Sequence, residues 1–377
     1  MSPPGAPLRR AAILALPVLA LACGADEPPA LEPTPHVVEV FVEGLKNPWA
    51  LDFAPDGRLF ITEAGGHLRV ATGGVLDPRP ERVPGVVQEW QGGLMDLAFH
   101  PDFANNRLLY LAYTVARDGK GMTRVSRFRE EEGALGAPQV VFEGFPGASE
   151  NKHFGCRLAF GADGKLYLTL GERHERQRAQ DLMDLNGKTL RLNDDGSVPA
   201  DNPFAGRADA RPEIFSYGHR NSQGMAVQPG TGLIFQTEHG PTGDDGPGGG
   251  DEVNLVEAGR NYGWPLVHHR ETREGTVPPL LEYTPALAPG GAVFYTGDAL
   301  KGWKGDFLFA NLVGQCLVRV KFDGRKVVGQ EILLRRTHGR LRDVAQGPDG
   351  AVYVITSNTD WNGSDRGGRT DRVLRVR

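Results

Sequence analysis

Short hydrophobic runs separated by turn residues recur along the chain, and six of them share one pattern. Each begins with a turn that contains Asp-Gly or a similar pair and continues as a run rich in β-branched and apolar residues. The copies lie at 55–62, 105–111, 162–169, 230–235, 304–309 and 348–354. Several follow another short apolar run, as at 50–53 and 97–100, so the local unit is a strand, a tight turn and a second strand.

Six copies of one hairpin predict an all-β fold, a six-bladed β-propeller. Such a fold repeats a small sheet around a central channel, and its loops meet at the ends of that channel. A long β-sandwich is the alternative, but it does not require six copies of one turn. The composition agrees with either all-β fold, because 51 Gly and 28 Pro are typical of short strands joined by turns.

The N-terminus has the pattern of an export signal. Arg9 and Arg10 precede an apolar run at 11–22, which is too short to span a bilayer. The run ends in Ala-Leu-Ala-Cys, which is similar to a bacterial lipobox, and this implies either lipidation at Cys23 or plain signal cleavage. We therefore expect an exported protein, either periplasmic or lipid-anchored to a bacterial membrane.

The domain boundaries follow from the same region. Residues 24–36 are rich in Pro and Glu, as expected of a disordered, solvated tether. We assign residues 1–23 to the signal, 24–36 to the tether and 37–377 to the propeller.

The charge of the chain limits its possible partners, and its cysteine content limits its possible disulfides. Lys and Arg number 42 against 47 Asp and Glu, and a net charge of −5 is too balanced to predict a nucleic-acid partner. Beyond the signal the cysteines are Cys156 and Cys316, far apart and in no paired motif. A disulfide is allowed in an oxidising compartment, but two buried small apolar residues are the simpler interpretation.

Two polar loops precede predicted strands and carry candidate chemistry. His153 lies in the charged loop 150–158, where an imidazole could accept a proton at neutral pH, although a lone His is more often structural. Arg220 and Asn221 lie in the Gly-flanked loop 217–224 and offer a fork-shaped donor for a planar anion beside an amide. A turn with a surface Arg remains the alternative there.

Two further clusters suit a metal and an anion. The loop 237–254 combines Asp, Glu and Asn with exposed Gly carbonyls, which are hard oxygen ligands suited to Ca²⁺, or else it is a flexible acidic loop. Arg340 and Arg342 are two residues apart, so on a strand both would point to one face and could clamp carboxylates. Two exposed arginines are the alternative.

The order and spacing of these motifs resemble the glucose/sorbosone dehydrogenase family from about Gly44 to the C-terminus. The matching motifs are Asn47-Pro48-Trp49-Ala50, Gln91-Gly92-Gly93-Leu94 with Phe99-His100-Pro101-Asp102-Phe103, Gly218-His219-Arg220-Asn221-x-Gln223-Gly224, Glu238-His239-Gly240-Pro241 with Asp251-Glu252-Val253-Asn254, Asn261-Tyr262-Gly263-Trp264-Pro265, and Arg340-Leu341-Arg342-Asp343-Val344. Members of the family are six-bladed propellers that oxidise sugars with pyrroloquinoline quinone (PQQ) and calcium. The aldose sugar dehydrogenase branch is the more similar one.

The resemblance implies three catalytic positions. His153 matches the general base that removes the proton of the anomeric hydroxyl while hydride passes from the sugar to PQQ. Gln91 matches a residue beside the sugar and the cofactor. Arg220 matches the group that supports negative charge on the reduced quinone.

The resemblance also implies the binding positions. Positions that bind PQQ match Gln91, Arg220, Asn221, His239, Arg340 and Arg342, and fork-shaped donors suit the three carboxylates of PQQ. Backbone carbonyls of Gly240 and Pro241 match those that hold the Ca²⁺ at the quinone, and Glu252 and Tyr262 match positions of a structural calcium. An aldose substrate and a quinone or redox-protein electron acceptor are the implied partners.

The chain departs from the family pattern in three respects. Where a Lys commonly binds a carboxylate of PQQ, the stretch 311–313 reads Asn-Leu-Val, so Val313 removes a charge-assisted contact. The loop between Pro241 and Asp251 carries extra residues, 244–250, next to the expected calcium site. The aromatic residues that stack on PQQ in the glucose enzymes have no evident match.

Two other functions stay open at this point. A cofactor-free binding module could use the same scaffold, because a fold does not fix a function, and Val313 favours it. A metal-dependent hydrolase of the lactonase kind would need several carboxylates in the channel, which only 238–252 supplies.

Overall fold

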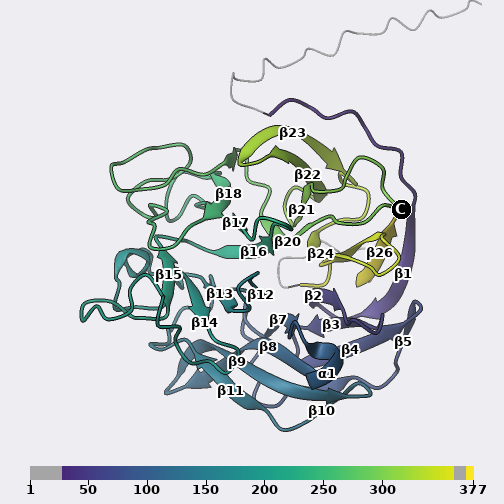
Figure 1. Ribbon diagram of the computed structural model, residues 1–377, viewed down its shortest axis with the longest axis horizontal. Helices are drawn as coiled ribbons and strands as arrows, with labels where there is room; N and C mark the ends of the chain where they lie inside the picture. Colours follow the sequence, from purple (N-terminus) through teal and green to yellow (C-terminus); the bar gives the residue numbers. More distant parts are fainter. Residues whose placement is uncertain (1–27, 361–370) are drawn as a thin grey trace, which may run out of the picture.

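The computed structural model describes residues 28–360 and 371–377, so the predicted signal, Cys23 and the first tether residues lie outside the described part. The described chain forms six antiparallel sheets arranged around a central axis (Figure 1). This arrangement confirms the predicted six-bladed β-propeller. The described helices are the short α1 (Phe103–Asn106) and the 3-10 helix η1 (Arg176–Gln180). No helix among the described residues is long and apolar enough to cross a membrane.

The first three blades follow one another along the chain. Blade 1 comprises β2 (Pro48–Phe53), β3 (Leu59–Glu63), β4 (His67–Thr72), β5 (Val75–Leu76) and β6 (Glu81–Arg82). Blade 2 comprises β7 (Leu94–Phe99), β8 (Leu108–Arg117), β9 (Lys120–Glu131), β10 (Ala134–Leu135) and β11 (Gln139–Glu143). Blade 3 comprises β12 (Gly155–Phe160), β13 (Leu166–Leu170), β14 (Lys188–Leu192) and β15 (Ile214–Tyr217).

Blades 4, 5 and 6 have four strands each, like blade 3. Blade 4 comprises β16 (Ser222–Val227), β17 (Ile234–Glu238), β18 (Asp251–Val256) and β19 (Leu281–Tyr283). Blade 5 comprises β20 (Pro289–Phe294), β21 (Phe307–Asn311), β22 (Cys316–Asp323) and β23 (Lys326–Leu333). Blade 6 comprises β24 (Leu341–Gln346), β25 (Val352–Thr356), β26 (Asp371–Val376) and β1 (Val38–Leu45).

Each of the six predicted turns connects the first strand of a blade to its second strand. In blade 1 the Ala54 amide donates to Arg58 and the Gly57 amide donates back to Ala54, both at 2.8 Å. Gly57 has φ +88, a conformation that favours glycine, and this explains the Asp-Gly pair of the pattern. The six turns therefore lie together at one end of the channel.

The opposite end of the channel has a different regular feature. Every first strand has a shift in its pairing with the second strand near its own first residues, for example between Gly155 and Leu158 or between Leu341 and Asp343. Such bulges bend a strand and redirect its side chains. The loops that enter the six first strands thus meet at this end.

An ion cluster lies between the two ends of the channel. The Arg157 guanidinium donates to Asp96 at 2.7 Å and to Asp343 at 3.1 Å, and all three side chains are buried. A Cβ on Gly291 would lie 1.5 Å from the Asp343 carboxylate, so this position must be glycine to leave room for the ions. The cluster ties the first strands of blades 2, 3 and 6 together.

The ring closes by pairing the two ends of the described propeller. Strand β1 pairs antiparallel with β26, from Val38 opposite Val376 to Leu45 opposite Asp371. The amides of Val37 and Arg377 also donate to each other's carbonyls, at 2.7 and 3.0 Å. Blade 6 is therefore built from both ends of the sequence.

The described part of the predicted tether contacts the propeller. Ala30 bridges Gln330 in a parallel arrangement, and the Thr34 amide donates to Glu331 at 2.9 Å. Leu31 covers Gly329, where a Cβ would lie 2.4 Å from its side chain. Residues 29–34 thus lie along β23 instead of extending into solvent as expected.

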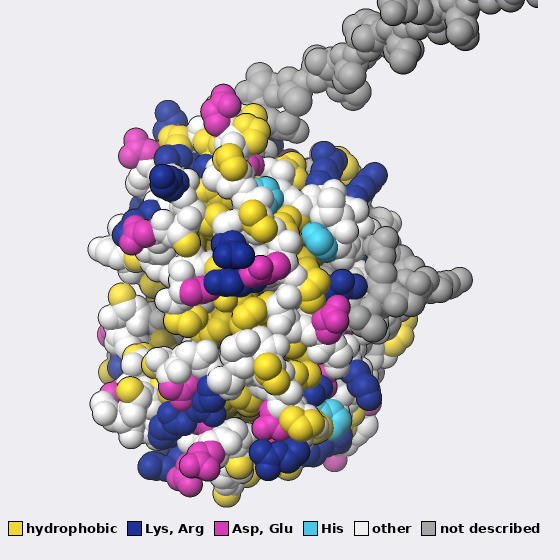
Figure 2. Space-filling view, turned by 90° about the vertical axis from the view of Figure 1, so that its right-hand side faces the viewer, with side chains coloured by type: hydrophobic (Ala, Val, Ile, Leu, Met, Phe, Trp, Pro, Cys, Tyr) yellow, Lys and Arg dark blue, Asp and Glu magenta, His cyan; other side chains and the backbone are white. Residues whose placement is uncertain are grey.

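The distribution of charge on the surface and the state of the two cysteines agree with what the sequence indicates. On the side that carries β1, basic and acidic side chains are interspersed with hydrophobic ones (Figure 2). Cys156 and Cys316 are both buried and unbonded to each other, as the simpler interpretation predicted.

Candidate active site

One cavity collects most of the predicted binding residues. It lies where the loops enter the first strands, at the channel end opposite the six turns. Its lining includes Gln91, Asn221, His239, Arg340 and Arg342. Residues more than 200 positions apart in the sequence thus face one space, because Gln91, Asn221, Arg340 and Arg342 precede or begin first strands and His239 follows a second strand at the same end of the channel. The position predicted to lack a Lys, Val313, also lines this cavity and is 54% exposed.

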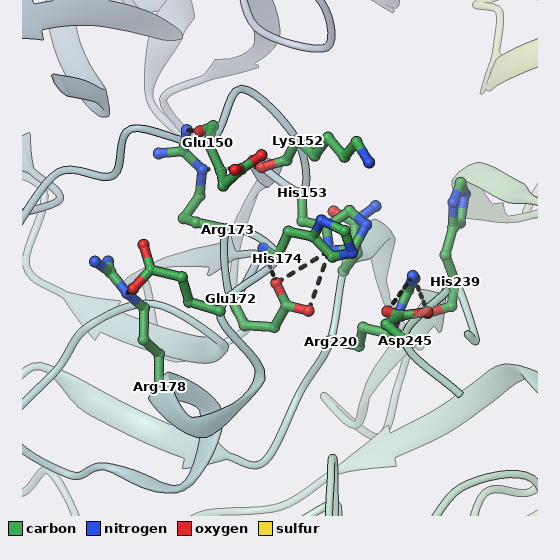
Figure 3. A network of polar contacts seen from close by, with 12 residues as sticks. Glu150, Lys152, His153, Glu172, Arg173, His174, Arg178, Arg220, His239 and Asp245 are labelled. Atoms are coloured by element: carbon green, nitrogen blue, oxygen red, sulfur yellow. Dashed lines mark hydrogen bonds and ion pairs between the residues drawn. The ribbon is translucent and has the colours of Figure 1, made fainter. Parts of the chain in front are cut away.

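His153 is buried beside the cavity and is bonded to a carboxylate. Its Nδ1 lies 3.0 Å from Oε2 and 3.1 Å from Oε1 of Glu172 (Figure 3). Burial lowers the pKa of His153 well below its usual value, and the nearby charge of Arg220 acts in the same direction. Burial also raises the pKa of Glu172 to about 7. The imidazole is therefore neutral at neutral pH, with Nδ1 directed at Glu172 and Nε2 as the other ring nitrogen.

The backbone around His153 is held in an unusual conformation by side chains of the cavity. His153 has φ +49 and Cys156 has φ +146, both in the left-handed region that L-residues seldom adopt. The His153 amide donates to Gln91 Oε1 at 2.8 Å, and the Gly155 amide donates to Asn221 Oδ1 at 3.0 Å. Gln91 and Asn221 thus fix the segment that carries the imidazole.

Arg220 does not line this cavity, but it lies next to it. Its guanidinium donates to the His239 carbonyl at 3.2 Å and pairs with Asp245, as Figure 3 shows. Its Nε and Nη2 both lie 2.7 Å from Asp245 Oδ2, so the buried guanidinium has a charge partner. Asp245 belongs to the extra loop segment, so this segment covers Arg220.

Arg340 and Arg342 share one buried carboxylate. Their Nη2 atoms lie 3.1 and 3.2 Å from Asp360 Oδ2, which also accepts from Ser357. Burial opposes the charge on Asp360, but Arg342 and Arg340 outweigh it and hold its pKa below the usual range. The two arginines point to one face, as their spacing predicted, and together carry one positive charge beyond that of Asp360.

His239 is neutral in this environment. Its Nε2 lies 2.8 Å from the Pro289 carbonyl, so Nε2 carries the proton and donates. Burial, together with the charge of Arg220, lowers the pKa of His239 to about 3. A neutral ring with its other nitrogen available can accept a hydrogen bond from a ligand.

The predicted metal residues line a second, smaller cavity. Gly240, Pro241, Glu252 and Tyr262 lie around it with Glu238. Burial and the neighbouring Glu238 raise the pKa of Glu252 well above its usual value. The Tyr262 hydroxyl donates to the Leu255 carbonyl and accepts from the Glu257 amide. Two adjacent carboxylates, of which Glu238 also contacts His219 Nδ1 at 2.9 Å, suit a divalent cation.

Sequence reasoning missed three of the acidic partners. Glu172 lies two residues after the end of β13, and a carboxylate so near the end of a buried strand could have drawn attention to it. Asp360 lies four residues after the end of β25. Asp245 lies in a segment that we noted as an insertion without assigning it a partner.

Comparisons with known proteins agree with this arrangement. The family model described as Glucose / Sorbosone dehydrogenase matches residues 45–363. Aldose sugar dehydrogenase YliI from Escherichia coli (strain K12) is 38% identical over 340 residues, which cover 85% of this chain and 90% of that protein.

Two solved structures share the fold over nearly their whole length. A putative oxidoreductase (glucose dehydrogenase) from Thermus thermophilus has a TM-score of 0.83 and 42% identity, over 91% of this chain and 100% of that one. The PQQ-bound form of the aldose sugar dehydrogenase from Streptomyces coelicolor has a TM-score of 0.79 and 31% identity, over 92% of this chain and 99% of that one.

Proposed function

This chain belongs to the glucose/sorbosone dehydrogenase family, and we propose that it oxidises aldose sugars at the anomeric carbon with PQQ and Ca²⁺. A sugar dehydrogenase is the function that its relatives support. The observation that carries the finer proposal is the buried, neutral His153, which Glu172 orients at the edge of a cavity lined by guanidinium groups.

The residues present fit an anionic cofactor. Arg340 and Arg342 carry more positive charge than Asp360 neutralises. A planar molecule with carboxylates would balance that charge. Asn221 and His239 would add an amide and a ring nitrogen from the same wall of the cavity.

The residues of the smaller cavity fit calcium. The carbonyls of Gly240 and Pro241 would hold the ion at the cofactor, and Glu252 would supply charge to a further ion. Pro241 already accepts a hydrogen bond from the Gly249 amide at 3.2 Å, and a carbonyl oxygen has a second lone pair for a metal.

The protein's own part in the reaction is to remove one proton. Nδ1–H of His153 donates to Glu172, so Nε2 carries the lone pair that accepts the proton of the anomeric hydroxyl. The C–H bond at the anomeric carbon breaks with its electron pair as the C=O bond of the lactone forms. PQQ, when bound, accepts that hydride, and Ca²⁺ makes it a better acceptor. Arg220 would stabilise negative charge on the reduced cofactor.

We also propose that the protein is exported and passes its electrons to a quinone or a redox protein. The support is the signal-like pattern at residues 1–23, with Cys23 as a lipid-anchor position. Labelling of cells with a fatty-acid analogue would test the anchor, since a Cys23→Ala variant should lose the label.

The central experiment is reconstitution of the purified full chain with PQQ and CaCl₂. We expect a change in the PQQ absorbance on binding and reduction of an artificial dye when aldoses are added. His153→Ala should retain the absorbance change and lose turnover. Absence of both signals in the parent protein would overturn the proposal and favour the cofactor-free binding module that Val313 suggests.

A further inference from the structure

A buried arginine follows the carboxylate that orients His153. Arg173 is 2% exposed and comes directly after Glu172 in the loop that follows β13. Its guanidinium has no carboxylate partner among the described residues. Burial lowers the pKa of Arg173 to about 10, so the side chain still carries its charge at neutral pH. A buried charge without a counterion is costly, and other groups must therefore stabilise it.

Three backbone carbonyls take the place of a carboxylate around Arg173. Its Nε donates to the Lys152 carbonyl at 3.0 Å, its Nη1 donates to the Gly121 carbonyl at 2.9 Å, and its Nη2 donates to the Glu150 carbonyl. Figure 3 shows the side chain extending from its loop toward Glu150 and Lys152. Hydrogen bonds from a charged donor are stronger than those between neutral groups. Arg173 therefore ties the segment that carries His153 to strand β9.

The guanidinium of Arg173 also stacks on an aromatic ring of the same segment. Its Cζ lies 3.6 Å from the centre of the buried Phe154 ring, a cation–π contact. A Cβ on Gly92 would lie 3.0 Å from this ring, and one on Gly121 would lie 3.7 Å from both the ring and Arg173 Nη2. Neighbouring backbone thus leaves the ring and the guanidinium little room to shift.

Two adjacent residues, Glu172 and Arg173, thus hold the ring and the backbone of His153. Glu172 contacts Nδ1 of the ring, whereas Arg173 binds the residues on either side, through the Lys152 carbonyl and the Phe154 ring. His153 and Arg173 have φ +49 and +63, conformations that persist only where the surroundings hold them. A shift of this segment would carry Nε2 away from the anomeric hydroxyl, and a misplacement of about 1 Å can lower a rate about 100-fold.

We propose that Arg173 is a positioning residue for His153: its guanidinium fixes the backbone of 150–154, and this keeps Nδ1 of the imidazole on Glu172 and Nε2 in place for the substrate. This inference rests on the proposed sugar oxidation. Arg173 does not line the cavity, so it acts on the chemical step through His153 and not on sugar binding. A lysine cannot replace it, because an ammonium lacks the planar fork that reaches three carbonyls at once.

The first test compares the kinetics of full-chain variants with PQQ and CaCl₂ present. Arg173→Lys keeps the charge and loses the fork, so kcat with D-glucose should fall about 30-fold or more, while KM changes less than about 2-fold. The spectrum of bound PQQ should stay unchanged. Phe154→Leu removes only the ring beside the guanidinium and should lower kcat about 3-fold. Arg127→Lys, at another arginine that donates to a backbone carbonyl, is the matched control and should keep the parent kcat.

A second measurement needs neither cofactor nor turnover and so separates this inference from the proposed reaction. In protein labelled with isotopic histidine, the NMR resonance of the His153 Nδ1–H proton reports its bond to Glu172, and His153→Ala identifies that resonance by its loss. We expect Arg173→Lys to shift or broaden the resonance and Arg127→Lys to leave it unchanged.

The outcomes of the two measurements are distinct. A parent protein that reduces no dye, but whose His153 resonance depends on Arg173, would refute the oxidation and support the positioning role. A parent-like kcat or an unchanged resonance in Arg173→Lys would refute that role. Thermal unfolding shows whether this variant folds, and if it does not, the same two outcomes are decided with Phe154→Leu.

Discussion

Asp245 pairs with Arg220 inside the protein, and both Nε and Nη2 of the guanidinium lie 2.7 Å from one carboxylate oxygen. The Asp245 carboxylate also accepts from the Thr242 amide, and its carbonyl accepts from Arg176. The extra segment 244–250 thus provides the counterion of Arg220, the residue that we propose to stabilise negative charge on the reduced cofactor.

Removing that counterion should destabilise the protein until an anion replaces it. Asp245→Asn leaves Arg220 buried without its charge partner, a change that costs about 3 kcal/mol in comparable pairs. Thermal unfolding should show a lower Tm for the variant alone, and added PQQ should raise its Tm more than that of the parent. Asp298→Asn, which changes a carboxylate that is 86% exposed, is the control. Equal Tm values for parent and variant would contradict the pairing.

The base should remain active below the usual pKa of histidine. Because burial and Arg220 lower the pKa of His153, it stays unprotonated as the pH falls past about 6.5. A base works only unprotonated, so protonation of His153 itself should lower kcat/KM only below pH 6.5, whereas a fall near pH 7 would report protonation of Glu172, whose pKa is about 7. A midpoint of this fall at or above pH 6.5 would exclude His153 as the titrating base.

Glu172 should be needed to orient that base. In Glu172→Gln the amide can donate to Nδ1 and favour the wrong tautomer, so kcat should fall about 100-fold or more, while the spectrum of bound PQQ stays unchanged. Glu172→Asp, which keeps the charge, should recover part of the rate. A Gln variant with the parent kcat would show that another group orients His153.

Val313 offers a gain-of-function test. It lines the cavity and is 54% exposed, so a longer charged side chain can extend from this position without being buried. Val313→Lys should lower the Kd for PQQ about 10-fold, as expected for one added charge-assisted hydrogen bond. Ile332→Lys, at an exposed position of β23 outside this cavity, should leave the Kd unchanged. An absorbance titration that gives equal Kd values would place the carboxylates of PQQ elsewhere.

Calcium should stabilise the protein through Glu252. Its buried carboxylate has Glu238 as a neighbour and Asn254 as its hydrogen-bond partner, so a divalent cation would relieve the repulsion. Saturating CaCl₂ should raise the free energy of unfolding by about 2–3 kcal/mol, and EGTA should remove the gain. Glu252→Gln should reduce the gain strongly, and Glu271→Gln, at a side chain that is 54% exposed, should not. A full calcium response in Glu252→Gln would contradict the assignment.

The central ions should support the fold independently of any ligand. Arg157→Met leaves Asp96 and Asp343 as two buried carboxylates without a counterion, at a cost of about 3–5 kcal/mol. Denaturant unfolding should reveal this loss, and adding Asp96→Asn and Asp343→Asn to the variant should recover part of it. Arg129→Met, at a side chain that is 61% exposed, is the control. An unchanged midpoint in Arg157→Met would refute a supporting role.

The fold could be predicted because its signal is local. Each copy of the repeat encodes a turn of a few residues, such as 54–58, and the six turns have the same position in every blade. Several binding residues could be predicted for a related reason, since Gln91, Asn221, Arg340 and Arg342 lie just before or within a first strand.

The partners of those residues could not be predicted, because pairing depends on the finished fold. Glu172 is 19 residues from His153, and Asp245 is 25 residues from Arg220, with nothing local to connect them. The position of the tether could not be predicted for the same reason. Its Pro and Glu content indicates solvation, but Thr34 bonds Glu331, 297 residues away, which composition cannot reveal.

The closing pair β1 and β26 also restricts when the protein can fold. During synthesis β1 emerges among the first described residues, but its partner emerges only with the last ones. Until residue 376 is available, β1 has no strand to pair with and the ring stays open. A chain cut before β26 would lack both the strand and the closure. A nascent chain that cannot close early remains available to machinery that handles unfolded polypeptides.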